Sequence, residues 1–263
     1  MKKQPYDIGL VLSGGAARGF AHLGVLKALE EFNMKPDIIS GVSAGAIAGA
    51  LYADGFAPEE IVEIYTHKSL FEFMQMTVPK TGIFKPTGLK ETLKKNLRAT
   101  RFDQLKIPMV ITATNLIEGK SEYFRKGDLV DAIMASSCVP LLFETVMINK
   151  VPYIDGGVMN NMPVEPIEHA CKKLIGVYIN PTGKIDGLKG LMHIAERSFH
   201  LAIASEVNTK HKRFDIYIEP EEITAYSFFD MKKAPELLDL GYRKTVEILK
   251  RDKGQRTIRD ECA

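Results

Sequence analysis

Residue types suited to nucleophilic catalysis occur together in one run, Gly41-Val42-Ser43-Ala44-Gly45. It fits the pattern Gly-x-Ser-x-Gly, in which a strand turns abruptly into a helix and holds one serine hydroxyl at the turn. Glycines two residues before and after the serine let the two backbones pass closely without a Cβ clash. An apolar run precedes this one and small residues follow it, so Ser43 is a candidate nucleophile. An ordinary glycine-rich turn is the alternative.

A second stretch is rich in small residues and lies between an apolar run and an amphipathic one. It reads Ser13-Gly14-Gly15-Ala16-Ala17-Arg18-Gly19. A dinucleotide-binding fingerprint would need glycine where Ala16 stands, so nucleotide binding is the weaker interpretation. Small residues at the start of a helix expose successive backbone N–H groups, which suit the oxyanion of a tetrahedral intermediate. Arg18 could hold the carbonyl groups of this loop or add positive potential, and a plain tight turn is the remaining alternative.

A third stretch supplies a carboxylate, in Asp155-Gly156-Gly157 after a short apolar run. Alone it is typical of an Asp-Gly turn. A nucleophilic serine needs a base, most often a histidine held by an acid. No histidine stands where the late loop of a Ser-His-Asp triad would place it, so the pattern does not support a triad. The histidines are His22, His67, His169, His193, His200 and His211. Of these, His22 is close enough in sequence to the glycine-rich stretch to touch a site there, although a packed or exposed helix position is the simpler interpretation.

These stretches together resemble the bacterial patatin-like phospholipases, acyl hydrolases with a Ser-Asp dyad. The similarity runs from about residue 8 to residue 181 and includes 155–163 and a segment, 135–143, that lines the site in the family. It implies that Ser43 is the nucleophile and Asp155 its base. It also implies that the amides of Gly14, Gly15 and Ala16 form the oxyanion hole, supported by Arg18.

Two positions depart from the family pattern. Plant members carry glycine where this chain has Ala16, which keeps the N–H but narrows the backbone angles that the loop can adopt. Other members often carry aspartate at Ser13, which does not touch the chemistry.

The elements that must position these residues can be read from hydrophobic periodicity. Strands are predicted at 7–12, 37–40, 108–115, 121–125, 151–154, 174–180 and 215–218, and helices at about 19–31, 44–54, 128–137, 188–210 and 234–250. This alternation is typical of an α/β fold with a mostly parallel sheet covered on both faces, with functional residues at the carboxyl ends of the strands. The resemblance implies a three-layer sandwich, and the absence of repeats or linkers predicts a single domain over residues 1–263.

Composition limits the functional classes. The 263 residues carry 35 Lys and Arg against 33 Asp and Glu, a net charge of +2, which gives no reason to expect a nucleic-acid partner. Cys138, Cys171 and Cys262 form no disulfide framework or CxxC pair, and the first two are expected to be buried thiols. No metal-ligand spacing is visible, so neither a metal nor a cofactor is expected. The apolar run after Lys2 and Lys3 is too short for a signal peptide, and a cytoplasmic protein is expected.

The substrate class rests on the resemblance, which implies a lipid or other acyl ester. Phenylalanines and methionines within 71–76, followed by 78–84, could form a lid or a lipid-contacting rim, with core packing as the alternative. Lysines at 80, 85, 90, 94 and 95 leave peripheral contact with a membrane surface open, against a solvated helix face. An acyltransferase with the same acyl-enzyme, or a non-catalytic protein that binds a nucleotide or anion, is the alternative function. The sequence does not set the oligomeric state.

Overall fold

The computed structural model describes residues 4–66, 75–76, 84–184, 187, 190–207, 209–228 and 231–261. Its centre is a sheet ordered β10-β9-β1-β2-β5-β8-β7, with β6 also paired to β5. The strands are β1 (Tyr6–Leu12), β2 (Ile38–Val42), β5 (Met109–Asn115), β6 (Lys120–Phe124), β7 (Val146–Ile148), β8 (Val151–Asp155), β9 (Cys171–Val177) and β10 (Ile216–Ile218). The five from β10 to β5 are parallel, whereas β6, β7 and β8 pair in antiparallel fashion. A mostly parallel sheet was predicted, and the structure confirms it.

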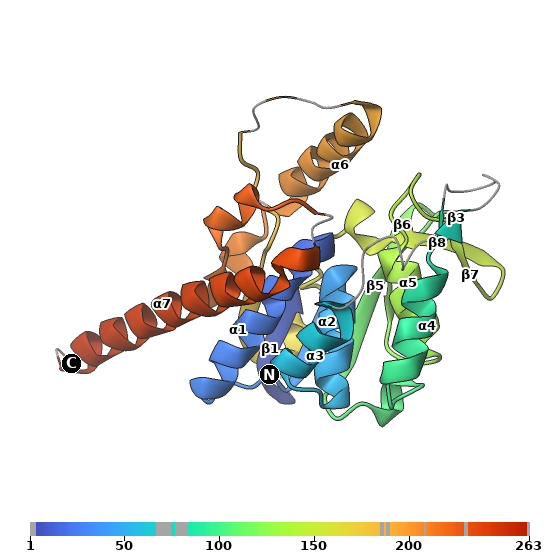
Figure 1. Cartoon of the computed structure of the whole chain (residues 1–263). Helices are drawn as coiled ribbons and strands as arrows, with labels where there is room; N and C mark the ends of the chain where they lie inside the picture. Colours follow the sequence, from blue (N-terminus) through green and yellow to red (C-terminus); the bar gives the residue numbers. More distant parts are fainter. Residues whose placement is uncertain are drawn as a thin grey trace.

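Helices cover both faces of this sheet (Figure 1). A hydrophobic core lies on each face of the sheet, and one core is larger than the other. Neighbouring residues of β5 point to opposite faces, so Ile111 packs in the larger core and Val110 in the smaller one. The larger core receives α1 (Phe20–Glu31), α2 (Ala44–Asp54), α3 (Pro58–Thr66), α4 (Thr87–Asn96), α5 (Leu129–Ser137) and α7 (Ala234–Glu261). On the other face α6 (Leu191–Val207) contributes Ile203 and Val207. Helices, sheet and helix therefore form the three layers expected.

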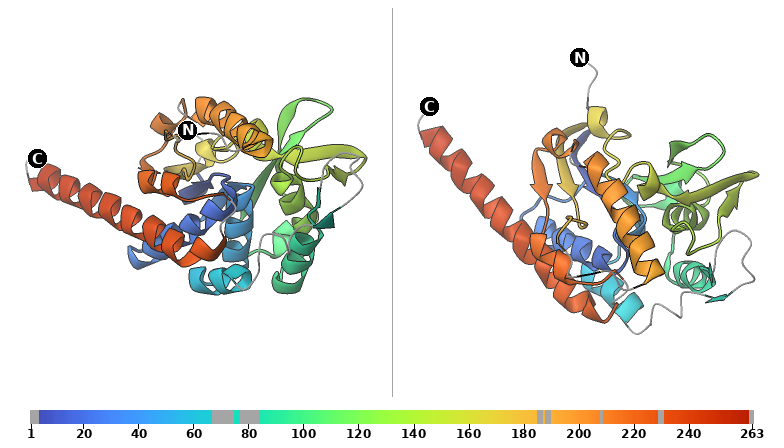
Figure 2. Two further views of the ribbon diagram at one scale, coloured as in Figure 1. Left: turned by 45° about the horizontal axis from the view of Figure 1, so that its top comes forward. Right: turned by 90° about the horizontal axis from the view of Figure 1, so that it is seen from above.

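The last helix packs tightly on the first. A Cβ on Gly24 of α1 would lie 1.8 Å from the Leu238 carbonyl oxygen, and one on Gly241 of α7 would lie 2.0 Å from the Ala21 carbonyl oxygen. Only glycine allows this approach of two helix backbones. Beyond the contact, α7 extends away from the body of the molecule (Figure 2). The C-terminal helix α7 thus packs against the N-terminal helix α1.

Most of the helices and strands predicted from local sequence patterns are present in the structure. Gly55 ends α2 with φ 100°, and the Asp128 side chain caps α5 by accepting a hydrogen bond from the Asp131 N–H at 2.8 Å. Cys138 and Cys171 are both buried, as expected. The helices α3 and α4 and the strand β7 were not predicted. The suggested lid lies outside the described residues, except that β3 (Gln75–Met76) pairs with β4 (Phe84–Lys85).

Candidate active site

Ser43 stands at a tight turn between β2 and α2. Its φ of 52° is strained for a residue with a side chain, and such strain concentrates at functional sites. A Cβ on Gly41 would lie 2.7 Å from the Gly45 carbonyl oxygen, and one on Gly45 would lie 2.4 Å from the Leu12 carbonyl oxygen. Both glycines are therefore required by close backbone contact. The turn leaves Ser43 only 8 % exposed, with its side chain in a cavity.

Asp155 is the last residue of β8. One strand, β5, lies between β8 and β2, the strand that leads into Ser43. The Asp155 carboxylate accepts a hydrogen bond of 2.7 Å from the Gly157 N–H, and the Ser43 side chain is near enough to lower its pKa as a hydrogen-bond donor. Burial raises the pKa of Asp155 from 3.8 to about 6, although these two donors lower it in part. A carboxyl group with this pKa can accept a proton from serine near neutral pH. The structure thus brings together the two residues singled out as nucleophile and base.

The last turn of α5 and the residue that follows it, Cys138, form hydrogen bonds with the backbone of both residues. Ser136 Oγ accepts a hydrogen bond of 2.8 Å from the Ser43 N–H and donates one of 2.6 Å to the Thr112 carbonyl oxygen. The Cys138 carbonyl oxygen accepts a hydrogen bond of 2.8 Å from the Asp155 N–H. Sequence reasoning identified this segment but not these roles. Its run of small hydroxyl residues before Pro140 was the signal available.

The glycine-rich stretch lies directly against Ser43, since a Cβ on Gly14 would lie 3.1 Å from the Ser43 Cβ. The structure narrows the expected set of oxyanion donors. The Gly14 N–H donates to Asn161 Oδ1 at 3.0 Å, so this amide is already engaged within the protein. The amides of Gly15 and Ala16 have no such acceptor in the part of the chain that the structure describes. Ala16 adopts φ 47°, so the backbone tolerates alanine there at a cost in strain.

Arg18 contacts residues that are far from it in the sequence, and not the carbonyl groups of its own loop as expected. Its Nε and Nη2 donate to the Tyr226 carbonyl oxygen at 3.0 and 2.8 Å, and its guanidinium lies 3.9 Å from the centre of the Phe228 ring. The Ala17 N–H also donates to the Phe228 carbonyl oxygen at 3.0 Å. Arg18 therefore ties the segment before α7 to the glycine-rich stretch. No local sequence signal could indicate these partners.

His22 does not provide the base of a triad. Its Nε2 lies 2.8 Å from the Ser13 carbonyl oxygen, to which it must donate, and burial lowers its pKa to about 4. His200 is also buried, with its ring edge-on to Phe228. Among the histidine side chains that the structure describes, none forms a hydrogen bond with Ser43. His22 is therefore a neutral core residue that supports the glycine-rich stretch.

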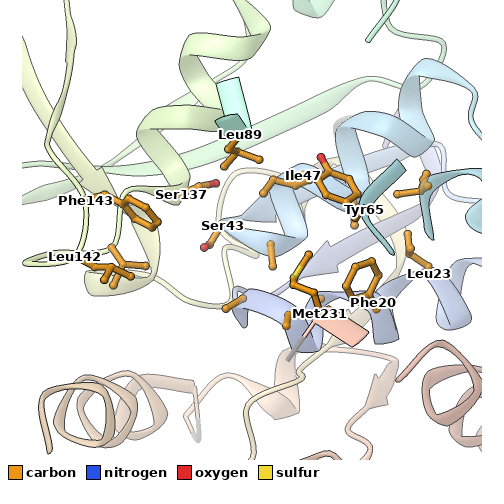
Figure 3. Close-up of a pocket in the computed structure, with 17 residues that line it drawn as sticks. Phe20, Leu23, Ser43, Ile47, Tyr65, Leu89, Ser137, Leu142, Phe143 and Met231 are labelled. Atoms are coloured by element: carbon orange, nitrogen blue, oxygen red, sulfur yellow. The ribbon is translucent and has the colours of Figure 1, made fainter. Parts of the chain in front are cut away.

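An apolar cavity of about 160 Å³ opens beside Ser43 (Figure 3). It lies between the glycine-rich stretch, α1, α2, α3 and the segment that follows α5. Its lining includes Phe20, Leu23, Ile47, Tyr65, Leu142 and Phe143. Such a lining suits a hydrocarbon chain. Among the described residues, no three His, Cys, Asp or Glu side chains are grouped as metal ligands, and no helix has the length and apolar character to span a bilayer.

Comparison with known proteins identifies the family. Residues 10–167 match the model described as "Patatin-like phospholipase", which is more than half of the chain and includes both Ser43 and Asp155. The chain belongs to the patatin-like phospholipase family. This confirms the resemblance inferred from the sequence.

Two relatives and one solved structure show how far the similarity extends. Lysophospholipase NTE1 of Kluyveromyces lactis is 28 % identical over 271 residues, covering 89 % of this chain and 18 % of the relative. An "Uncharacterized NTE family protein" of Mycobacterium bovis is 30 % identical over 162 residues, covering 61 % of this chain and 45 % of the relative. The chain thus spans less than half of these relatives. VipD from Legionella pneumophila has the same fold, with a TM-score of 0.55, 16 % identity and coverage of 95 % and 71 % of the two chains.

Proposed function

We propose that this chain hydrolyses carboxylic esters of lipids, of the phospholipase or lysophospholipase type, through an acyl-enzyme on Ser43. The observation that carries the proposal is the position of a strained, nearly buried serine next to a buried carboxylate, beside an apolar cavity. Family membership and the names of the relatives support a lipid ester as the substrate class.

The chemistry follows from the positions of the groups. Ser43 Oγ attacks the ester carbonyl carbon while Asp155 takes its proton. The amides of Gly15 and Ala16 stabilise the oxyanion, each donor contributing about 3 kcal/mol at sites of this kind. The alcohol leaves with the proton from Asp155. Water then attacks the acyl-serine while Asp155 accepts a proton from it. The bond between the acyl carbon and Ser43 Oγ breaks, Ser43 Oγ takes this proton from Asp155, and the fatty acid is released.

A fluorophosphonate ester probe with mass-spectrometric mapping of the adduct tests this function. We expect labelling at Ser43 in the wild type, none in Ser43→Ala, and slower labelling in Asp155→Asn. Ser121→Ala is the matched control, since Ser121 lies on β6 outside the cavity and should leave labelling unchanged. Full ester turnover by Ser43→Ala, with the variant still folded, would refute the proposal.

Contact with a membrane surface is a separate part of the proposal. Two of the lysines considered for it lie near carboxylates, Lys85 at 4.0 Å from Glu144 and Lys90 at 2.9 Å from Asp131. Leu141, which is 71 % exposed, adjoins the cavity wall and supports contact with lipid at the mouth. Flotation with anionic and zwitterionic vesicles distinguishes charge-driven from apolar binding, and no flotation with either would contradict contact.

A further inference from the structure

The cavity has two parts that differ in burial. The inner part is closed by large side chains, apolar except for the Tyr65 hydroxyl, that are each at most 6 % exposed: Phe20, Leu23, Ile61 and Tyr65. The outer part is lined by half-buried Leu142 and Phe143, next to exposed Leu141. Figure 3 shows Phe20, Leu23 and Tyr65 on one side of Ser43, and Leu142 and Phe143 on the other. An acyl chain fits the buried inner part, so the alcohol portion of the ester must lie toward the outer part.

Ser137 stands at the beginning of the outer wall. It is the last residue of α5, and the chain continues from it to Leu142 and Phe143. Ser137 lines the cavity and is 8 % exposed. Within the described part of the chain its buried Oγ has no hydrogen-bond partner. A buried hydroxyl without a partner is costly in free energy, so a group of this kind in an otherwise apolar wall indicates a partner that arrives with the substrate.

Both sequence neighbours of Ser137 are bonded to the reacting residues. Ser136 Oγ accepts from the Ser43 N–H at 2.8 Å, and the Cys138 carbonyl oxygen accepts from the Asp155 N–H at 2.8 Å. Ser137 is thereby held close to Ser43 and Asp155. Since the ester carbonyl oxygen is assigned to the glycine-rich stretch, the remaining polar atom of the ester is the alkoxy oxygen. That oxygen must face Asp155 to receive a proton.

We infer that the Ser137 hydroxyl donates a hydrogen bond to the alkoxy oxygen of the bound ester and orients it for protonation. The inference rests on the proposed function. When the tetrahedral intermediate collapses, the bond between the carbonyl carbon and the alkoxy oxygen breaks. Its electron pair stays on that oxygen, which takes the proton held by Asp155. Ser137 keeps its own proton. It contacts the substrate at the oxygen of the leaving alcohol.

Two esters of one fatty acid, monolauroylglycerol and p-nitrophenyl laurate, test the inference. An alkoxide needs protonation to leave, whereas p-nitrophenolate is a stable anion that does not. We expect Ser137→Ala to lower kcat/KM for the glycerol ester about tenfold, the worth of one hydrogen bond, and to change that for the aryl ester less than about twofold. Ser137→Thr, which restores a hydroxyl, should recover most of the glycerol esterase activity.

Ser136→Ala is the matched control, because it removes the neighbouring hydroxyl that holds the Ser43 N–H. It should lower kcat/KM for both esters by the same factor. Equal losses for both esters in Ser137→Ala, or no loss for either, would overturn the inference and leave the proposed function intact. A wild type that cleaves neither ester and takes no fluorophosphonate label at Ser43 would instead refute the proposed function, and this inference with it.

Discussion

At the residue scale, Asp155, the proposed base, illustrates how burial changes the pKa of an ordinary side chain. Its pKa is raised to about 6 chiefly because the carboxylate is removed from water. A raised pKa means that the group is ionised, and able to accept the Ser43 proton, only above that pH. We therefore expect kcat/KM for an uncharged ester to be constant at higher pH and to fall about tenfold per unit below about pH 6.

A pH–rate profile with an uncharged ester measures this directly. Circular dichroism across the same range should show that the fold is retained, so that loss of activity reports on ionisation. An inflection near the ordinary aspartate pKa, 3.8, would contradict a base in the buried position observed.

At the scale of elements, the turn at Ser43 depends on the contact between β1 and α2. A Cβ on Gly45 would lie 2.4 Å from a backbone oxygen, that of Leu12, which cannot move aside. We expect Gly45→Ala to destabilise the protein by about 2 kcal/mol or more, as overpacking of a rigid contact does. Urea unfolding measures the change in free energy.

Gly49 in the same helix is the matched control for that substitution. Its Cβ would meet only side-chain atoms, with Ile39 and Met109 each at 3.0 Å. Alanine also favours the helix by about 1 kcal/mol over glycine, which offsets the tight contact. Gly49→Ala should therefore change the free energy of unfolding by less than about 1 kcal/mol. Equal losses in both variants would show that helix packing in general, and not the turn, is sensitive.

The same elements show what sequence could predict. The turn at Ser43 and the start of α5 near residue 128 depend on residues a few positions apart, so their local patterns were sufficient. The partners of the glycine-rich stretch lie far away: Asn161 is 147 residues from Gly14, and Tyr226 is 208 residues from Arg18. No periodicity reports such contacts. That is why the engagement of the Gly14 N–H was missed, whereas the residues themselves were placed in the site.

At the scale of the whole molecule, the family match ends at residue 167 but the fold does not. The pairing of β10 with β9 and the glycine contact between α1 and α7 complete it. We propose accordingly that residues 1–263 form one domain. A fragment of residues 1–181 loses α6, β10 and α7, so we expect it to lack a cooperative thermal transition and to take no fluorophosphonate label.

Co-expression of residues 182–263 should restore labelling of that fragment, because the two pieces can then bury their shared core. Calorimetry and the labelling assay measure the two properties. A fragment of residues 1–181 that unfolds cooperatively and labels like the full chain would contradict the single-domain proposal.

The two parts of the cavity have an evolutionary consequence. Ile61 and Tyr65, which close the inner part, belong to α3, whereas Ser43 and Asp155 are fixed at the ends of strands. Mutations on α3 can lengthen or shorten the inner part of the cavity, the proposed site of the hydrocarbon chain, without displacing Ser43 or Asp155. Under the proposed function, natural selection can therefore change the preferred acyl-chain length and the catalytic residues independently. One ancestral scaffold can then give rise to paralogues that cleave lipid esters of different chain lengths.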